Sequence, residues 1–124
     1  MNNFRELKVW QKSMKLITDT YCFTQKFPYN EMYGLTSQIR RSAISIASNI
    51  AEGCGRKSNK ELSNFLSISL GSAYEFETQL IICKNLDYLD EETFERIESE
   101  IYHIQNMIVK LSSSIEDKQN TEKH

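Results

Sequence analysis

The sequence predicts an all-α protein, an antiparallel up-down-up-down four-helix bundle. Four segments carry apolar residues at alternating spacings of three and four, which is the pattern of an amphipathic helix. Turn-forming residues are scarce, with 4 glycines and 1 proline in 124 residues, so a few long elements are expected. Short connections make consecutive helices antiparallel neighbours. A long coiled-coil hairpin is the alternative, but four separate apolar stripes favour the closed bundle.

The first helix is expected from about Asn3 to Lys26, because Pro28 follows it closely. Its main apolar stripe, expected to face the core, consists of Leu7, Trp10, Met14, Ile17 and Tyr21. A second stripe at a spacing of seven consists of Val9, Leu16 and Phe23.

The second helix is expected to begin between Asn30 and Leu35 and to end near Gly53, where a left-handed glycine would terminate it. Its core stripe consists of Ile39, Ala43, Ile46 and Ile50. A further small and apolar stripe consists of Ile44, Ala47 and Ala51.

The third and fourth helices carry recognisable start signals. Ser58 with Glu61 three residues later is a capping box, so the third helix is expected from Ser58 to about Leu86. Asp90 is the expected cap of the fourth helix. The third helix presents a stripe of Leu62, Leu66, Ser69, Ala73, Phe76, Leu80 and Cys83. The fourth presents a heptad stripe of Phe94, Ile97, Ile101, Ile104, Ile108, Leu111 and Ile115.

Composition indicates one domain over residues 1–115 and a polar, frayed tail over 116–124. The net charge of −2 means that nucleic-acid binding would have to rest on a local basic patch. Three widely spaced cysteines without a CxxC pair fit a reducing cytoplasm. No apolar run approaches the roughly 20 residues of a membrane span. A cytoplasmic protein with no membrane association is expected.

The additional stripes of the first two helices predict self-association. A four-helix core needs one stripe from each helix, so the second stripes would lie on the surface of a monomer, where apolar patches usually mark an interface. Two mid-helix arginines can pair across it with Glu75 or Glu77, or join a nucleic-acid surface. The predicted homo-oligomer interface is Val9, Leu16, Phe23, Arg40, Arg41, Ile44, Ala47 and Ala51. The alternative is that these stripes widen the internal core.

The sequence offers no convincing catalytic or metal site. Glu100-x-x-His103 has the spacing used in di-iron bundles, but such a site needs a second copy of the motif, and the only other histidine is His124. His103 also falls off the apolar stripe and is expected at the surface. Cys54 lies in a glycine turn with no histidine beside it in the sequence. No catalytic residue, metal, cofactor or small-molecule substrate is predicted.

A basic cluster is the candidate site for an anion. Residues 55–58 lack the spacing and the preceding strand of a P-loop, but a basic helix N-terminus is a plausible anion site. In an up-down bundle this turn lies at the same end as the start of the first helix. The residues predicted to contact phosphate are Arg5, Lys8, Arg56, Lys57 and Lys60. The alternative is a set of solvated side chains. Asn49 and Glu52, beside the turn, are expected in a buried polar network.

Short motifs spread from about Phe4 to Leu111 carry a family resemblance. They are Leu7-x-x-Trp10, Phe27-Pro28, Tyr33-Gly34-Leu35, Gln38-Ile39-Arg40-Arg41-Ser42-Ala43, Ser48-Asn49-Ile50-Ala51-Glu52-Gly53, Arg56, Phe65-Leu66, Gly71-Ser72 and Glu75-x-Glu77-Thr78-Gln79-Leu80. On these, the chain resembles the four-helix bundle proteins encoded within intervening sequences of bacterial 23S ribosomal RNA genes. The resemblance implies an up-down bundle and a ring-like homo-oligomer, a pentamer in related proteins. The chain is also similar to accessory proteins of diversity-generating retroelements, which bind a reverse transcriptase and RNA.

The expected function is therefore that of a non-enzymatic, oligomeric accessory protein associated with RNA or a ribonucleoprotein. The alternative is an assembly scaffold that binds another protein and has no nucleic-acid role.

Overall fold

The computed structural model describes residues 3–122, with side chains from 3 to 118, and every regular element in that range is a helix. The four long helices are α1 (Lys8–Thr24), α2 (Leu35–Cys54), α3 (Asn59–Asn85) and α4 (Glu91–Glu122). Two single-turn 3-10 helices, η1 (Phe4–Glu6) and η2 (Tyr29–Glu31), precede α1 and α2. The predicted all-α class is confirmed.

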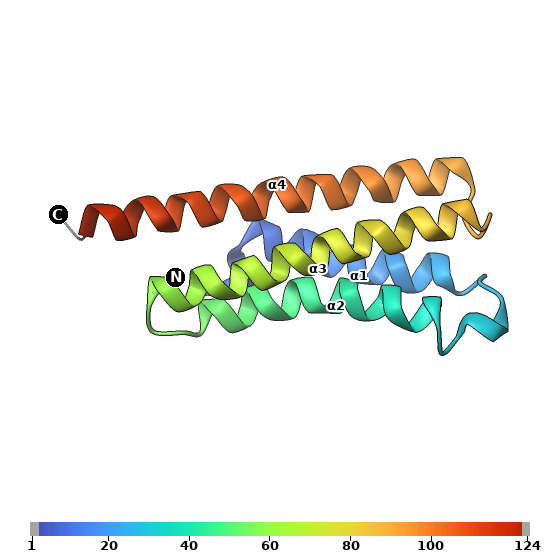
Figure 1. The fold of residues 1–124 in the computed structure, drawn as a ribbon, viewed down its shortest axis with the longest axis horizontal. Coiled ribbons are helices and arrows are strands. Elements are labelled where there is room, and N and C mark those ends of the chain that lie inside the picture. Colours follow the sequence, from blue (N-terminus) through green and yellow to red (C-terminus); the bar gives the residue numbers. More distant parts are fainter. Residues whose placement is uncertain (1–2, 123–124) are drawn as a thin grey trace.

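The helices pack in the order in which they follow one another along the chain. Contacts join α1 to α2, α2 to α3 and α3 to α4, and α1 also packs against α4 (Figure 1). This is the arrangement of an up-down-up-down bundle. α4 is the longest helix, and its C-terminal end runs past the N-terminal end of α1 (Figure 1).

N-terminal capping hydrogen bonds are present at the starts of α3 and α4, at the residues predicted from the sequence. Ser58 Oγ accepts the N–H of Glu61 at 3.1 Å, and the two side chains meet at 3.2 Å, which is the predicted capping box. Asp90 Oδ1 accepts the N–H of Thr93 at 2.7 Å at the start of α4. This backbone hydrogen bond is the main reason that the pKa of Asp90 is lowered.

The structure does not confirm the prediction that a left-handed glycine at position 53 ends the second helix. No glycine in the described part of the chain has a positive φ, and α2 continues through Gly53 to Cys54. A Cβ atom at position 53 would lie 2.9 Å from Leu62 Cδ1 and 2.9 Å from Phe65 Cβ. Glycine is needed here because α3 approaches closely, not because the backbone is left-handed.

The core stripe of α1 also differs from the prediction. Val9, Leu16 and Phe23 are buried in the core of the chain itself, so their assignment to an oligomer interface was wrong. Met14 and Tyr21, predicted to face the core, are instead exposed. The remaining members of the predicted stripe, Leu7, Trp10 and Ile17, are partly buried and pack against the core, so that prediction is only partly correct.

Buried hydroxyl groups explain why the stripe of Val9, Leu16 and Phe23 is the more deeply buried one. Ser13 and Thr20 lie between the apolar core residues of α1, and Thr24 extends the same stripe. Ser13 Oγ donates to the carbonyl of Val9 at 2.7 Å, Thr20 Oγ1 to that of Leu16 at 2.6 Å, and Thr24 Oγ1 to that of Thr20 at 2.7 Å. Each hydroxyl is satisfied by its own helix and can be buried at little cost.

The apolar residues of α2 divide differently from those of α1. Ala47 is buried, so its assignment to an interface was wrong, whereas Ile44 is exposed and Ala51 is partly exposed. The predicted core stripe is buried and consists of Ile39, Ala43, Ile46 and Ile50.

Hydrogen bonds made by side chains tie α2 to α3. Two of them join side chains, Ser42 Oγ to Gln79 Oε1 at 2.7 Å and Ser45 Oγ to Ser72 Oγ at 2.8 Å. In a third bond, from a side chain to the backbone, Ser69 Oγ donates to the carbonyl of Ile46 at 2.8 Å. Small residues at this contact let the two helices approach closely. The α2–α3 pair is therefore held by polar bonds as well as by apolar packing.

α3 and α4 bury their predicted stripes, except that Leu111 is only partly buried. α4 is helical to Glu122, beyond the predicted bundle boundary at residue 115. The division into a bundle and a frayed tail stays a prediction, since residues 123–124 lie outside the described part. No helix within residues 3–122 has the length and apolar character needed to cross a membrane.

Candidate functional site

The turn between α2 and α3 and the first turn of α3 carry three of the five residues predicted to contact phosphate. Arg56, Lys57 and Lys60 are all exposed. Arg56 Nη2 forms an ion pair with Glu52 Oε1 at 2.8 Å, and its guanidinium lies 4.9 Å from the centre of the Phe65 ring. Glu52 therefore offsets part of the positive charge of Arg56, which makes the two lysines the stronger candidates for binding an anion.

Arg5 and Lys8 lie at the same end of the bundle but are set back along its axis. Both are exposed, and the Arg5 guanidinium lies 5.9 Å from the centre of the Phe4 ring. α1 begins further inside the bundle than the α2–α3 turn (Figure 1). The five predicted residues thus share one end without forming one compact cluster.

The two mid-helix arginines point to different sides of α2. Arg40 Nε donates to Thr24 Oγ1 at 2.9 Å, and its guanidinium lies 4.4 Å from the centre of the Tyr21 ring. Both contacts join α2 to α1 within one chain. Arg41 is exposed and lines a shallow hollow with Gln38, Ser45, Glu75 and Gln79.

The predicted polar network beside the turn is only partly present. Asn49 Nδ2 donates to the carbonyl of Ser45 at 2.8 Å and to its hydroxyl at 3.0 Å, which joins it to the polar contact between α2 and α3. Glu52 is exposed and pairs with Arg56 instead, so its assignment to a buried network was wrong.

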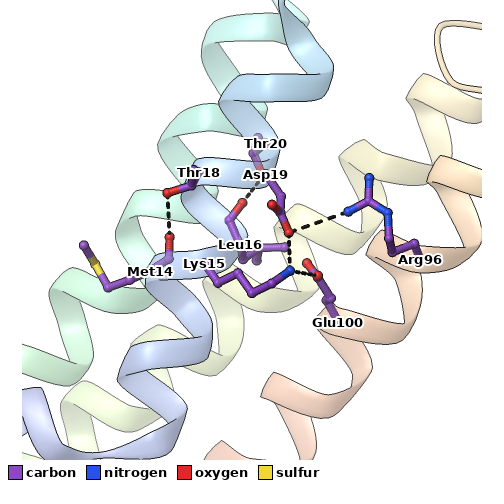
Figure 2. Close-up of polar contacts among 8 residues, drawn as sticks. All are labelled: Met14, Lys15, Leu16, Thr18, Asp19, Thr20, Arg96 and Glu100. Atoms are coloured by element: carbon purple, nitrogen blue, oxygen red, sulfur yellow. Dashed lines mark hydrogen bonds and ion pairs between the residues drawn. The ribbon is translucent and has the colours of Figure 1, made fainter.

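A charged cluster between α1 and α4 was missed by the sequence analysis (Figure 2). Lys15 Nζ contacts Asp19 Oδ2 at 2.7 Å and Glu100 Oε1 at 2.6 Å. Arg96 Nη1 lies 3.7 Å from the same Asp19 oxygen. The only sequence signal for this cluster was the spacing of four between Lys15 and Asp19, which often forms an ion pair on a helix.

Burial and hydrogen bonds shift the pKa values of Glu100 and Lys15 in this cluster. Burial raises the pKa of Glu100, with a smaller contribution from Asp19, although the hydrogen bond from Lys15 acts in the opposite direction. Hydrogen bonds to Asp19 and Glu100 raise the pKa of Lys15. The Oε2 atom of Glu100 is buried without a hydrogen-bond partner. Two cations face two carboxylates, so the cluster links α1 to α4 electrostatically.

Other ionisable groups show no metal-binding arrangement in the described part of the chain. His103 is exposed, and no group of three or more His, Cys, Asp or Glu residues there is placed to hold a metal ion. All three cysteines are free, with Cys22 exposed. Burial raises the pKa of Cys54 and raises that of Cys83 to about 12, so both thiols are protonated at neutral pH.

These features define an all-α four-helix bundle that exposes charged and apolar side chains on its surface. The family model described as 23S rRNA-intervening sequence protein matches residues 5–110. The chain belongs to this family.

A solved structure shares the fold. It is that of a protein of unknown function from the S23 ribosomal protein family of Bacteroides thetaiotaomicron VPI-5482, with a TM-score of 0.77 and 24% sequence identity. The match covers 85% of this chain and 95% of that protein. Among curated proteins, none matches the chain.

Proposed function

We propose that this protein is a cytoplasmic, non-enzymatic helical bundle that self-associates and binds RNA, alone or within a ribonucleoprotein, at its basic end. The observation that carries the RNA proposal is the exposure of Lys57 and Lys60 at the N-terminal end of α3. Helix N-termini favour anions, and the two lysines add full positive charges there. The family description refers to 23S rRNA, which supports RNA as the polyanion. Self-association into a ring, with five copies as the family resemblance implies, belongs to the same proposal.

The charge of the whole chain limits how this binding can work. A net charge of −2 gives no general attraction to a polyanion, so affinity must come from a small number of phosphate contacts. Arg56 must exchange its ion pair with Glu52 for a phosphate, whereas Lys57 and Lys60 have no such pair among the described ion pairs. The lysines are therefore expected to dominate, with Arg5 and Lys8 as a second, set-back group.

RNA binding by variants of the two lysines tests this proposal. Fluorescence anisotropy with a labelled structured RNA, from about 50 to 200 mM salt, should show weaker binding by Lys57→Ala and by Lys60→Ala. Each variant should also reduce the slope of log affinity against log salt by about 1. Lys26→Ala, which removes an exposed lysine from the opposite end of the bundle, is the matched control. Equal affinity and slope for all four proteins would contradict the basic end as the binding site.

The second candidate function is a protein-binding scaffold without a nucleic-acid role. It is favoured by the acidic character of α3 and α4, which together contain eleven acidic and five basic residues. Such a surface repels RNA and suits a basic protein partner. A partner that co-purifies after complete nuclease digestion, with no RNA binding by the purified chain, would favour this function over the first.

A further inference from the structure

A polar hollow of about 420 Å³ lies along the α2–α3 pair. Clefts that hold small ligands measure about 300–1,000 Å³, so the hollow is large enough to receive one. Every residue that lines it carries hydrogen-bonding groups; the lining consists of Gln38, Arg41, Ser45, Glu75 and Gln79. Such a lining suits a ligand with a polar edge rather than an apolar one.

The amide of Gln79, which is only 7% exposed, is held in one orientation beneath the hollow. Ser42 Oγ has a single proton and lies 2.7 Å from Gln79 Oε1 but 3.1 Å from the carbonyl of Ile39, so the shorter contact assigns the proton to Gln79. Gln79 Nε2 is then a donor without an acceptor among the described side chains. The unpaired atoms that are sealed from solvent there are Thr36 Oγ1 and Glu100 Oε2, so Gln79 Nε2 opens into the hollow. A buried donor without a partner indicates that a ligand supplies one.

Arg41 and Glu75 bring opposite charges to the hollow without neutralising each other. Both are exposed, and neither takes part in an ion pair among the side chains of residues 3–118. The neighbouring Arg40, by contrast, is occupied by Thr24 and Tyr21. Arg41 therefore keeps its planar fork of N–H donors, and Glu75 keeps two acceptor oxygens.

Guanine has the complementary arrangement of polar groups. Its O6 and N7 atoms are neighbouring acceptors that an arginine fork binds together, the commonest specific contact to a base. Its N1–H and 2-amino groups are neighbouring donors that one carboxylate can accept together. Adenine places an amino donor where guanine has O6, and the pyrimidines lack the pair of neighbouring donors. A hollow with an unpaired arginine and an unpaired carboxylate therefore fits guanine better than the other bases.

We propose that this hollow binds the guanine of an unpaired nucleotide in RNA. Arg41 donates to O6 and N7, Gln79 Nε2 donates to O6, and Glu75 accepts from N1–H and the 2-amino group. The inference rests on the RNA binding in the proposed function and adds a base-specific contact to the phosphate contacts of Lys57 and Lys60. Phosphate contacts position a nucleic acid, whereas contacts to base edges specify its sequence.

The hollow and the basic end lie on the same pair of helices, which lie side by side (Figure 1). α2 ends at Cys54, so a helical rise of about 1.5 Å per residue places Arg41 about 20 Å from the turn that carries Lys57. A single strand that follows the α2–α3 pair can contact both places, because unpaired RNA can turn its bases toward a protein.

Binding of short RNA strands with single base changes tests the proposal. In fluorescence anisotropy, an oligouridine with one central guanosine should bind about fivefold or more tightly than the oligouridine alone, whereas central adenosine or cytidine should give a smaller gain. Replacing that guanosine by 7-deazaguanosine removes the N7 acceptor, and replacing it by inosine removes the 2-amino group. Each analogue should weaken binding.

Variants of the two charged residues connect each analogue to its side chain. Arg41→Lys keeps the charge but loses the fork, so it should abolish the difference between guanosine and 7-deazaguanosine with an unchanged salt slope. Glu75→Ala should abolish the difference between guanosine and inosine while binding oligouridine slightly more tightly, because a negative charge is gone. Glu92→Ala at an exposed site is the matched control and should keep both differences. Circular dichroism checks that each variant remains helical.

An NMR titration of the unmodified chain tests the same contact without any variant. The side-chain NH₂ signals of Gln79 and the Nε–H signal of Arg41 should shift when the guanosine strand is added. The NH₂ signals of Gln25, which is exposed and does not line the hollow, should not shift. Gln79 signals that stay in place while the strand binds would overturn the proposal.

The outcomes separate this inference from the proposed function. Equal affinity for all the strands, with Lys57→Ala still weakening each of them, would overturn the guanine contact and leave RNA binding at the basic end standing. A guanine preference that survives both Arg41→Lys and Glu75→Ala would place the base elsewhere and also overturn the proposal. No binding of any strand would overturn the RNA role and the guanine contact together.

Discussion

Replacing Gly53 by alanine should destabilise the bundle, whereas the same replacement at Gly71 should stabilise it. Both glycines lie inside helices, Gly53 in α2 and Gly71 in α3, and neither has a positive φ. In a helix interior alanine is favoured over glycine by about 0.8–1 kcal/mol. Any difference in stability between the two variants therefore reflects the atoms that the added methyl group contacts.

The contacts at the two positions set the magnitudes. At Gly53 the methyl group would lie 2.9 Å from Leu62 Cδ1, which can rotate away, and 2.9 Å from Phe65 Cβ, which cannot move without α3. Overpacking of this kind costs about 1–3 kcal/mol, which leaves a net destabilisation of up to about 2 kcal/mol after the gain of about 1 kcal/mol in helix propensity. At Gly71 no side chain or remote backbone atom of the described residues would lie within 4 Å of the added methyl group, so the gain of about 1 kcal/mol should appear in full.

Urea unfolding followed by circular dichroism measures both variants. The experiment must use one protein concentration throughout, because the proposed self-association would stabilise the folded state to an extent that depends on concentration. Gly53→Ala should unfold at lower urea than the unmodified chain and Gly71→Ala at higher urea, with unchanged slopes. A Gly53→Ala variant that is as stable as Gly71→Ala would show that α3 does not pack tightly on α2 at this point, which would refute the packing argument.

Two further predictions concern the ionisable groups. With a thiol reagent at pH 8, Cys22 should react quickly in the folded protein, whereas Cys54 and Cys83 should react only after unfolding, because they are buried and their pKa values are raised; rapid reaction of all three in the folded state would contradict their burial. Burial raises the pKa of Glu100 above its ordinary 4.5, so the carboxyl binds a proton more strongly in the native state than in the unfolded state. The contribution of Glu100 to stability therefore falls as the pH rises above 4.5. Glu100→Gln should therefore remove part of the pH dependence of the thermal midpoint above pH 4.5, whereas Glu92→Gln at an exposed site should not, and identical profiles would contradict the assignment.

Features that depend on neighbouring residues were predictable from the sequence. The capping box at Ser58 and the cap at Asp90 appear as predicted, because a helix start is decided within four residues. The apolar stripes of α3 and α4 are also largely buried as predicted, since their periodicity is long and strong.

Features that depend on packing between distant residues were not predictable in the same way. The choice of buried stripe in α1 failed because Ser13 and Thr20 are polar by composition, although their hydroxyls are satisfied by the carbonyls of their own helix. Gly53 was misread because the close approach of α3 leaves no local signal. The link from Lys15 to Glu100 joins residues 85 positions apart, and only the fold brings them together.

The residues of the candidate site could be predicted from the sequence, but their arrangement in space could not. The sequence identified Lys57 and Lys60 as exposed basic residues, and both are exposed. It could not show that Glu52 pairs with Arg56, since several acidic residues lie within reach of that turn in the sequence. It also placed Arg5 and Lys8 with the turn, without the offset of α1 along the bundle axis that Figure 1 shows.

The buried hydroxyls of α1 also bear on how the native state opens. Ser13 and Thr20 donate to carbonyls of α1 itself, so their hydrogen bonds survive if the helix moves away as a unit. The serines between α2 and α3 bond from one helix to the other and would lose their partners on separation. Separation of α1 as a unit therefore leaves these hydroxyls paired, whereas opening the α2–α3 pair leaves its buried serines without partners, which favours the persistence of the α2–α3 pair in partly unfolded states.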